Sequence, residues 1–268
     1  MIIERRELKQ QAKQVMRGVR PSPYWVSLLM MVIGLILTVL SMSLNGSLAA
    51  YRTMYEAAMQ GRLVYVEPQA VGGGIGWLLN LALDVMSWVI GVGFVIYAMR
   101  LWRREQGSVG NLFDGFGVFF RSVWIQLLPG LFMTAWSLLY VMPVSAMIAM
   151  TGQVWWAVIG LPLLIPAVKA YFSYRLATYM MLDNPGLTCM QCIAFSREVM
   201  NGHKIEAFKL ELSFIGWYLL GALIPVAGLL VIVWVNIYYQ TVFAGYYDNL
   251  MADYMARSAP PVDMPPAY

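Results

Sequence analysis

The sequence predicts an all-α membrane protein with six transmembrane helices paired as three hairpins, each preceded by an amphipathic helix at the cytoplasmic interface. Of its 268 residues, 60% are hydrophobic and 12% are charged, whereas soluble domains carry about 25% charged residues. The apolar residues gather in segments of about 20, the length that crosses about 30 Å of hydrocarbon, and the basic residues gather in alternate loops. This composition excludes a soluble enzyme, a disordered chain and a nucleic-acid binder.

Six apolar segments have the length of a span: Tyr24–Leu44, Ile75–Met99, Val123–Ile148, Val154–Thr178, Phe208–Ile224 and Ala227–Tyr247. Pro225 and a short glycine-containing bend separate the last two, so a single long tilted helix over 208–247 competes with a tight hairpin. One helix over both segments would be about 54 Å long at 1.5 Å per residue, much longer than the bilayer is thick. The hairpin is therefore the favoured interpretation.

The basic residues orient the predicted spans. On one side lie Arg5, Arg6, Lys9, Lys13, Arg17, Arg20, Arg100, Arg103, Arg104, Arg121, Arg197, Lys204, Lys209 and Arg257. Of the 18 lysines and arginines, only Arg52 and Arg62 fall on the other side, and Lys169 and Arg175 fall within span four. The positive-inside rule places the basic side in the cytoplasm. Both termini are therefore expected there.

Short patterns recur along the chain and suggest a repeated unit. Residues 13–18 and 197–202 both read basic-x-Val-Met-x-Gly, each shortly before an apolar segment. We interpret the chain as a single membrane domain (1–268) that ends in a flexible, Pro-rich tail (251–268). Because each unit begins on the same side, the repeats are expected to be parallel. The possible units are residues 1–104, 105–183 and 184–250.

Two of the expected interfacial helices have a clear apolar face. In the N-terminal arm this face consists of Leu8, Ala12, Val15, Met16 and Val19. Residues Thr188–Met200 are similar, with Thr188 as the expected N-cap. Such helices lie in the headgroup plane, where their basic side favours anionic lipid. They form either a structural collar on the span ends or a sensor of lipid or of a partner, such as another membrane protein or a second copy; no nucleic-acid partner is expected.

Several local motifs carry a family resemblance. They are Asp183-Asn184-Pro185, Ser196-Arg197-Glu198-x-Met200-x-Gly202-His203-Lys204, Leu212-Ser213-Phe214-Ile215-Gly216-Trp217, Arg6-x-Leu8-Lys9-x-x-Ala12-Lys13 and Trp136-Ser137-Leu138-Leu139. In these motifs, and over nearly its whole length, the chain resembles an uncharacterised bacterial integral-membrane family, domain of unknown function 975. It departs from the family at about 145–157, where this chain is longer between spans three and four. The resemblance implies a multi-pass protein of the bacterial cytoplasmic membrane and supplies no activity, ligand or catalytic residue.

The residue types of common enzyme chemistry are scarce. The single histidine, His203, lies in a polar Asn-Gly-His-Lys turn, whereas histidine-based acid–base and nucleophile sites need a well-placed imidazole. Cys189 and Cys192 have no second cysteine pair to complete a zinc site, and thiols on the cytoplasmic side stay reduced. We interpret both as small packing residues and expect no catalytic, metal or cofactor site.

Charged and amide side chains inside the predicted spans are the remaining candidates for a functional site. Asp84 lies deep in span two, and Lys169 lies in span four. A charge at the bilayer centre costs about 2.5–3.5 kcal/mol on insertion scales, so it faces the bundle interior, finds a partner or extends to the headgroups. Other polar residues that could line the same interior are Asn80, Gln126, Asn236 and Gln240.

Two interpretations of Asp84 and Lys169 stay open. They meet at a polar site used for binding or passage, or they are a structural ion pair or two unrelated groups. The first functional hypothesis is a non-enzymatic, lipid- or protein-binding accessory module. The alternative is a small permease or channel with Asp84 and Lys169 in its path.

Overall fold

The computed structural model describes residues 5–62, 64–68, 74–223 and 225–258, and every regular element in these ranges is a helix. The prediction of an all-α protein is therefore confirmed. In chain order the elements are α1 (Arg5–Met16), α2 (Pro23–Leu44), α3 (Ser47–Met59), α4 (Gly74–Trp102), η1 (Val109–Val118), α5 (Phe119–Thr151), α6 (Trp156–Ile159), η2 (Leu161–Leu164), α7 (Ile165–Tyr174), α8 (Ala177–Asp183), α9 (Cys189–Val199), α10 (Lys204–Leu223) and α11 (Pro225–Ser258).

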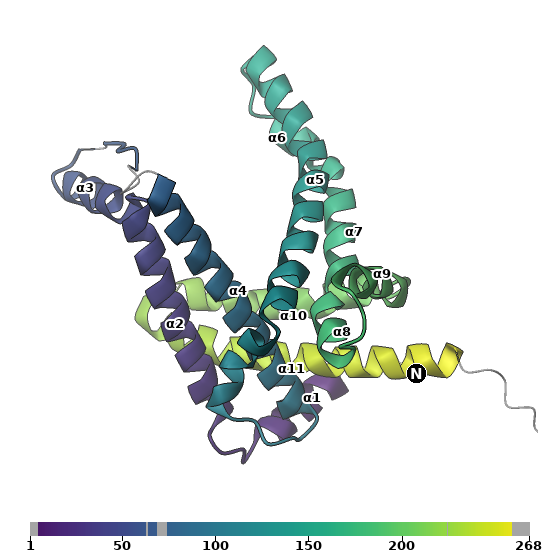
Figure 1. Cartoon of the computed structure of the whole chain (residues 1–268). Helices are drawn as coiled ribbons and strands as arrows, with labels where there is room; N and C mark the ends of the chain where they lie inside the picture. The colour runs from purple at the N-terminus through teal and green to yellow at the C-terminus, as the bar shows by residue number, and fades with distance from the viewer. Residues whose placement is uncertain (1–4, 63, 69–73, 224, 259–268) are drawn as a thin grey trace, which may run out of the picture.

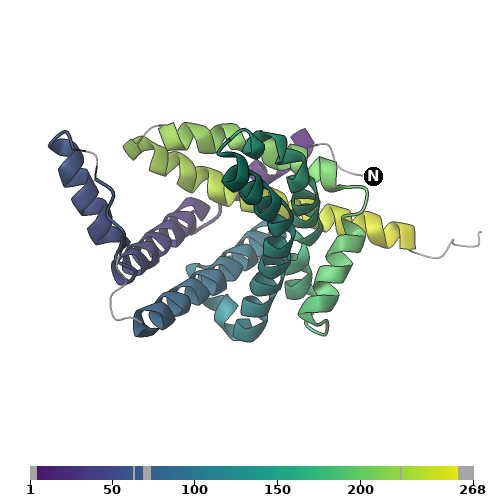
Figure 2. The same ribbon diagram turned by 90° about the horizontal axis from the view of Figure 1, so that it is seen from above.

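Two upright helix pairs diverge from one end of the molecule, and a third pair lies across that end (Figure 1). The upright pairs are α2 with α4 and α5 with α7, and the crosswise pair is α10 with α11, as the view from above also shows (Figure 2). Ser27, near the start of α2, donates its hydroxyl to the Val233 carbonyl of α11 at 2.7 Å. At the end of α4, the Trp102 ring packs on Gly245 of α11. The helix α11 therefore runs past the ends of both members of the first pair.

The number of membrane-spanning helices differs from the expected six. Four described helical segments are long and apolar enough to cross a membrane: Pro23–Leu44, Gly74–Trp102, Val109–Thr151 and Gly228–Ser258. The helix α10 falls outside this set because its 20 residues include the charged residues Glu206, Lys209 and Glu211. The prediction of six spans is therefore not confirmed, although the first three predicted segments lie within α2, α4 and α5.

The predicted fourth span, Val154–Thr178, is broken into α6, η2, α7 and the start of α8. Pro162 and Pro166 each stand in the first two positions of a new helical segment. Proline has no backbone N–H to donate and fits there, whereas it disrupts a helix interior. Apolar composition alone did not distinguish this broken path from one continuous helix.

The α10–α11 pair is a hairpin, so the competing interpretation of one long helix is wrong. The rings of Trp217 and Trp234 have centroids 5.4 Å apart, and Phe214 and Tyr238 are equally close. Near the bend, a Cβ on Gly228 would lie 1.8 Å from the Gly221 carbonyl oxygen, so the two backbones touch where neither residue has a side chain. Residue 224, the expected end of span five, lies outside the described residues.

The expected interfacial helix before the second hairpin is a 3₁₀ segment, η1, packed on α4. A Cβ on Gly93 of α4 would lie 2.0 Å from the Leu112 carbonyl oxygen, and one on Gly115 would lie 2.2 Å from the Val89 carbonyl oxygen. Glycine at both positions lets the two backbones come into direct contact. Periodicity of apolar residues could not reveal this contact, since the residues responsible are those with no side chain.

The helices α1 and α9, which were expected at the interface, bury most of their apolar faces against protein. Leu8, Ala12 and Met16 of α1 are buried, and the Lys9 Nζ atom lies 2.7 Å from the Ser213 hydroxyl and 4.5 Å from the Phe214 ring centroid. Burial, together with the nearby cations Lys13 and Arg5, lowers the pKa of Lys9. This packing agrees with the collar interpretation and shows that part of the basic face also contacts the protein.

Two smaller expectations have different outcomes. Thr188 caps α9 as predicted, because its hydroxyl accepts from the Gln191 backbone N–H at 3.3 Å. The expected flexible tail does not begin at residue 251, since α11 continues to Ser258. The rest of that tail, 259–268, lies outside the described residues.

Gly93→Ala is expected to destabilise the protein by about 2 kcal/mol, because the new methyl group meets backbone atoms of η1 that cannot move independently. Gly91→Ala is the matched control on the same helix, since a Cβ there meets nothing within 4 Å. It should stabilise α4 by about 0.5–1 kcal/mol. Thermal unfolding of the two purified variants in detergent measures the difference, and equal melting temperatures would contradict the close contact.

Candidate functional site

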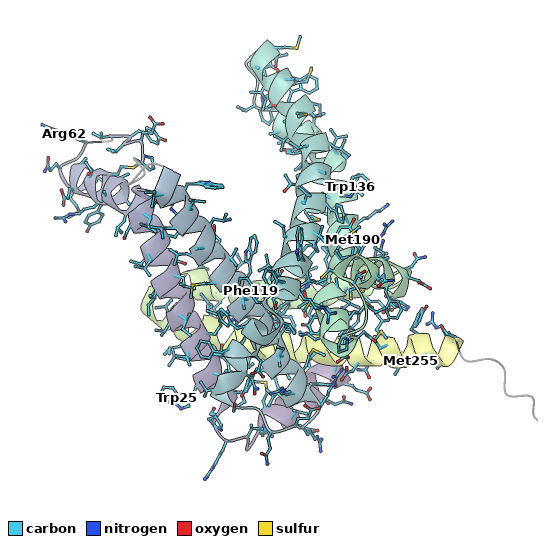
Figure 3. The ribbon with its side chains drawn as sticks, in the orientation of Figure 1. Trp25, Arg62, Phe119, Trp136, Met190 and Met255 are labelled. Carbon is cyan, nitrogen blue, oxygen red and sulfur yellow. The ribbon has the colours of Figure 1, made fainter. Side chains whose placement is uncertain are left out.

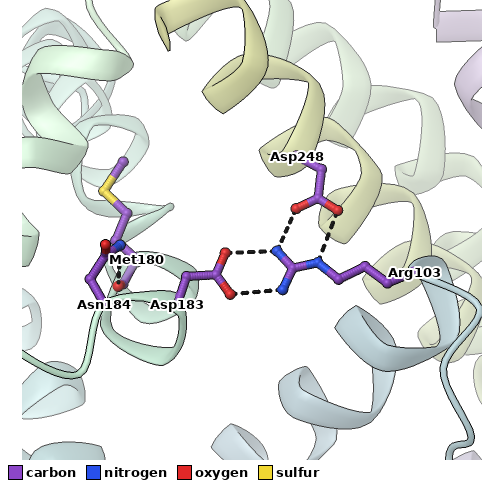
Figure 4. Close-up of polar contacts among 5 residues, drawn as sticks. All are labelled: Arg103, Met180, Asp183, Asn184 and Asp248. Carbon is purple, nitrogen blue, oxygen red and sulfur yellow. Dashed lines mark hydrogen bonds and ion pairs between the residues drawn. The ribbon is translucent and has the colours of Figure 1, made fainter.

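An arginine clamp joins three segments that are far apart in the sequence (Figure 4). Arg103, which follows α4, donates Nη1 and Nη2 to the two carboxylate oxygens of Asp183 at 2.8 and 2.7 Å. It donates Nε and Nη2 to Asp248 at 3.1 and 2.7 Å. The hydrogen bonds to Asp183, then those to Asp248, raise the pKa of Arg103 above its ordinary value. Because Asp183 ends α8 and Asp248 lies in α11, this Arg103 clamp links the three helix pairs.

A second polar cluster lies between α7, α10 and α11. Arg175 donates Nε to Glu211 Oε1 at 3.1 Å and Nη2 to the Tyr239 hydroxyl at 2.6 Å. The hydroxyls of Tyr239 and Tyr171 donate to the same Glu211 oxygen at 2.9 and 3.3 Å. The side chains of Arg175 and Glu211 are 22% and 18% exposed. Their charges are therefore shielded from water and attract more strongly than a surface pair would. We call these four residues the Arg175 cluster.

A break in the helix sets the position of Arg175. The helix α7 ends at Tyr174, and α8 begins at Ala177. At the break, the Leu176 backbone N–H donates to the Ser196 hydroxyl of α9 at 3.3 Å, and that hydroxyl donates to the Ser173 carbonyl at 2.7 Å. Ser196 is fully buried, so its side chain supplies the partners that the interrupted helix lacks. The break brings Arg175 to 4.6 Å from the Phe243 ring centroid of α11, a cation–π distance.

An apolar groove of about 330 Å³ lies beside the Arg175 cluster, between α5, α7 and α10. We call it the α5–α7–α10 groove. Glu211 and Tyr171 form its polar part. The apolar wall includes Met133, Leu164, Val168, Phe208, Leu212 and Ile215. The three hydrogen bonds to Glu211 all end on Oε1, so among the described residues its Oε2 atom has no hydrogen-bond partner.

The structure does not bring Asp84 and Lys169 together. Asp84 is exposed on α4 and Lys169 is exposed on α7, and no ion pair joins them among the described residues. Lys169 accepts a hydrogen bond from the Ser173 hydroxyl at 2.7 Å. The acceptor is its backbone carbonyl and not its side chain. The expectation of a shared site at these two residues therefore has no geometric support.

The four predicted amide residues have separate environments. Asn80 accepts from the Ser41 hydroxyl at 2.6 Å and so links α4 to α2. Gln126 and Asn236 are half-buried on α5 and α11. Gln240 directly follows Tyr239 of the Arg175 cluster on α11, and its Oε1 atom accepts from the Tyr179 hydroxyl at 3.2 Å.

Sequence reasoning missed Arg175 and Glu211 as a pair. A signal was present, since the two opposite charges fall inside the predicted spans Val154–Thr178 and Phe208–Ile224. The helix break that aims Arg175 at α10 depends on Ser196, which is far away in sequence. Charge inside an apolar segment was the useful indicator, and the choice of partner required tertiary contacts.

The other reactive residue types lie outside the groove. Cys192 is fully buried on α9, and burial raises the pKa of its thiol. Cys189 is half-buried, with its sulfur 3.7 Å from the Arg121 carbonyl oxygen. His203 Nδ1 lies 3.4 Å from Glu206 Oε2, one turn along α10.

Comparison with known proteins gives one match. Residues 1–253 match the family described as "Protein of unknown function (DUF975)". No curated protein and no solved structure matches the chain.

Arg103→Ala is expected to lower the free energy of unfolding by about 2 kcal/mol, because it removes charge-assisted hydrogen bonds from two partly buried carboxylates. Arg104→Ala is the control, since Arg104 is exposed and forms no ion pair among the described residues. Thermal unfolding in detergent compares the two. A loss of the same size in both variants would contradict the role of the Arg103 clamp.

Glu211→Gln is expected to cost about 3 kcal/mol of stability, because it leaves the shielded Arg175 cation without its counter-charge. Glu206→Gln on the same helix should change stability by no more than about 0.5 kcal/mol, since the Glu206 side chain is 45% exposed and its contact with His203 is long, at 3.4 Å. The double variant Arg175→Met, Glu211→Gln should lose less than the two single losses added together. Additive losses in this cycle would show that the two side chains are not coupled.

Proposed function

Because the chain belongs to the DUF975 family of proteins of unknown function, whose description assigns no activity, we propose a function from its geometry. The protein is a non-enzymatic accessory module of the bacterial cytoplasmic membrane, with both termini in the cytoplasm, and it holds a membrane lipid in the α5–α7–α10 groove.

Large apolar side chains on the outer faces of the helices support the membrane setting. Leu35 and Ile36 of α2, Leu131 of α5 and Leu219 of α10 are each more than half exposed. Exposed apolar patches of this extent are rare on soluble monomers, and each Å² left in water costs about 25 cal/mol. Hydrocarbon chains of a bilayer remove this cost without a protein partner.

The observation that carries the proposal is the presence of one carboxylate, Glu211, in the lining of an otherwise apolar groove. An acyl chain along Val168, Leu212 and Ile215 replaces water with hydrocarbon, and the Glu211 Oε2 atom remains available to accept a hydrogen bond. The ammonium group of phosphatidylethanolamine has the matching chemistry, because it is a cation with N–H donors. The Arg175 contact is made through Glu211 Oε1, so the carboxylate can still meet a cationic donor through Oε2. The arrangement therefore favours binding.

The alternative, a permease or channel through Asp84 and Lys169, lacks comparable support. Both residues are exposed, and they lie on helices of different pairs. A transport path needs its polar groups along one continuous route, and no described contact connects these two.

Val168→Trp tests lipid binding in the α5–α7–α10 groove. Val168 lines the groove and is 48% exposed, so an indole ring there fills the groove without entering the core. Full-length protein in bilayers that contain phosphatidylethanolamine with a photoreactive acyl chain should form cross-links to the groove residues of α7 and α10. Val168→Trp should reduce these cross-links several-fold.

Ile165→Trp is the matched control, because Ile165 is also exposed on α7 and does not line the groove. It should leave the cross-links unchanged. The proposed function fails if cross-links form equally at Leu35 and Ile36 on the outer face of α2 and if both tryptophan variants behave like the wild type. Such a result would describe ordinary bulk lipid.

A further inference from the structure

We propose that a second groove, on the other side of α7, binds the phosphodiester group of an anionic phospholipid through Arg197 and Lys204. This site lies between α5, α7 and α9 and uses none of the residues of the Arg175 cluster. It does not depend on the function proposed above, because its lining residues and its charge are different.

The apolar part of this second groove has a volume of about 220 Å³. Phe132 and Trp136 of α5 form one wall, Tyr174 of α7 forms its inner end, and Met190 and Ile193 of α9 form the other wall. Figure 3 shows the labelled Trp136 and Met190 on the same side of the α5–α7 pair. Met190 is 53% exposed, in contrast to the buried face of the same helix. An acyl chain lying along α5 would cover both side chains.

A polar recess of about 450 Å³ continues from the apolar part, and the two share Ala194 and Arg197. Asn201 and Lys204 also line the recess. Arg197 is exposed and Lys204 is half-buried, and neither forms an ion pair among the described residues. Two cations without counter-ions therefore lie at the mouth of an apolar groove.

The one carboxylate in the recess is already engaged. Glu198 accepts a hydrogen bond from the neutral Tyr254 hydroxyl of α11 at 2.8 Å and keeps its charge, so the two cations and one carboxylate of the recess leave a net formal charge of +1. The helix α10 begins at Lys204 and α9 ends at Val199, so their terminal dipoles are opposite in sign and largely cancel at this turn. The side-chain cations thus decide the charge of the recess, which is positive.

This combination selects the ligand class. A guanidinium group binds phosphate oxygens in pairs, and an ammonium group supplies a second point charge. A free phosphate would use the cations and leave the apolar groove exposed, whereas a phospholipid uses both. The helix α9 lies beside the end of α7 at Tyr174, and an amphipathic helix with basic residues is expected at the level where headgroups meet the hydrocarbon of a bilayer. We therefore assign the site to an anionic phospholipid.

The test measures binding of phosphatidylglycerol to the full-length chain by native mass spectrometry from detergent, with phosphatidylcholine as the zwitterionic reference lipid of zero net charge. The wild type should retain phosphatidylglycerol preferentially. Arg197→Gln combined with Lys204→Gln should weaken this binding about thirtyfold, since each of the two basic residues near an anionic headgroup contributes about fivefold to the affinity. Lys209→Gln is the matched control, because Lys209 is exposed on α10 and lines neither groove.

Two further measurements separate the possible ligands. Trp136→Ala should weaken retention of phosphatidylglycerol while leaving both cations in place, which a site for free phosphate would not predict. Thermal unfolding of the wild type with inorganic phosphate should show no stabilisation comparable to that by the lipid. The proposal is overturned if phosphate stabilises as strongly as the lipid, if the double glutamine variant retains the lipid as well as Lys209→Gln does, or if both lipids bind equally.

Discussion

The Arg103 guanidinium lies between the carboxylates of Asp183 and Asp248 and forms four hydrogen bonds with them. A planar group with donors on two edges imposes both distance and orientation on its partners. Asp183 ends α8, which follows the second upright pair, Asp248 lies in the crosswise helix α11, and Arg103 follows α4 of the first pair. The placement of α11 across the helix ends and the contact of Trp102 with Gly245 both agree with this one geometry.

Much of the fold follows from the sequence, for identifiable reasons. Runs of apolar residues located α2, α4 and α5, and Thr188 located the start of α9, because both signals are local. The bend at Pro225 was also predicted, since a single helix would be too long for a bilayer. The orientation of α11 was not predictable from Gly228–Ser258, because a crosswise helix and a spanning helix have the same length and hydropathy. The direct backbone contact at Gly93 depends on an absent side chain and leaves no periodic pattern.

The candidate site was less predictable than the fold. Gln240 was singled out and does lie beside the Arg175 cluster, yet Asp84 and Lys169 were favoured over Arg175 and Glu211. Depth in a presumed span guided that choice, and the α7–α8 break and the crosswise α10 invalidate the presumed depths. A carboxylate on α10 and a guanidinium near the end of α7 meet because Ser196 holds the break open. A local sequence pattern does not predict long-range hydrogen bonds of this kind.

The Arg103 clamp also has a consequence for the order of events during translation. Arg103 leaves the ribosome first, Asp183 follows when the second upright pair has been made, and Asp248 emerges last. Until Asp248 is made, the guanidinium donors that face it, Nε and Nη2, lack that partner. The crosswise helix therefore completes a clamp whose first half, between Arg103 and Asp183, can already form before α11 is made.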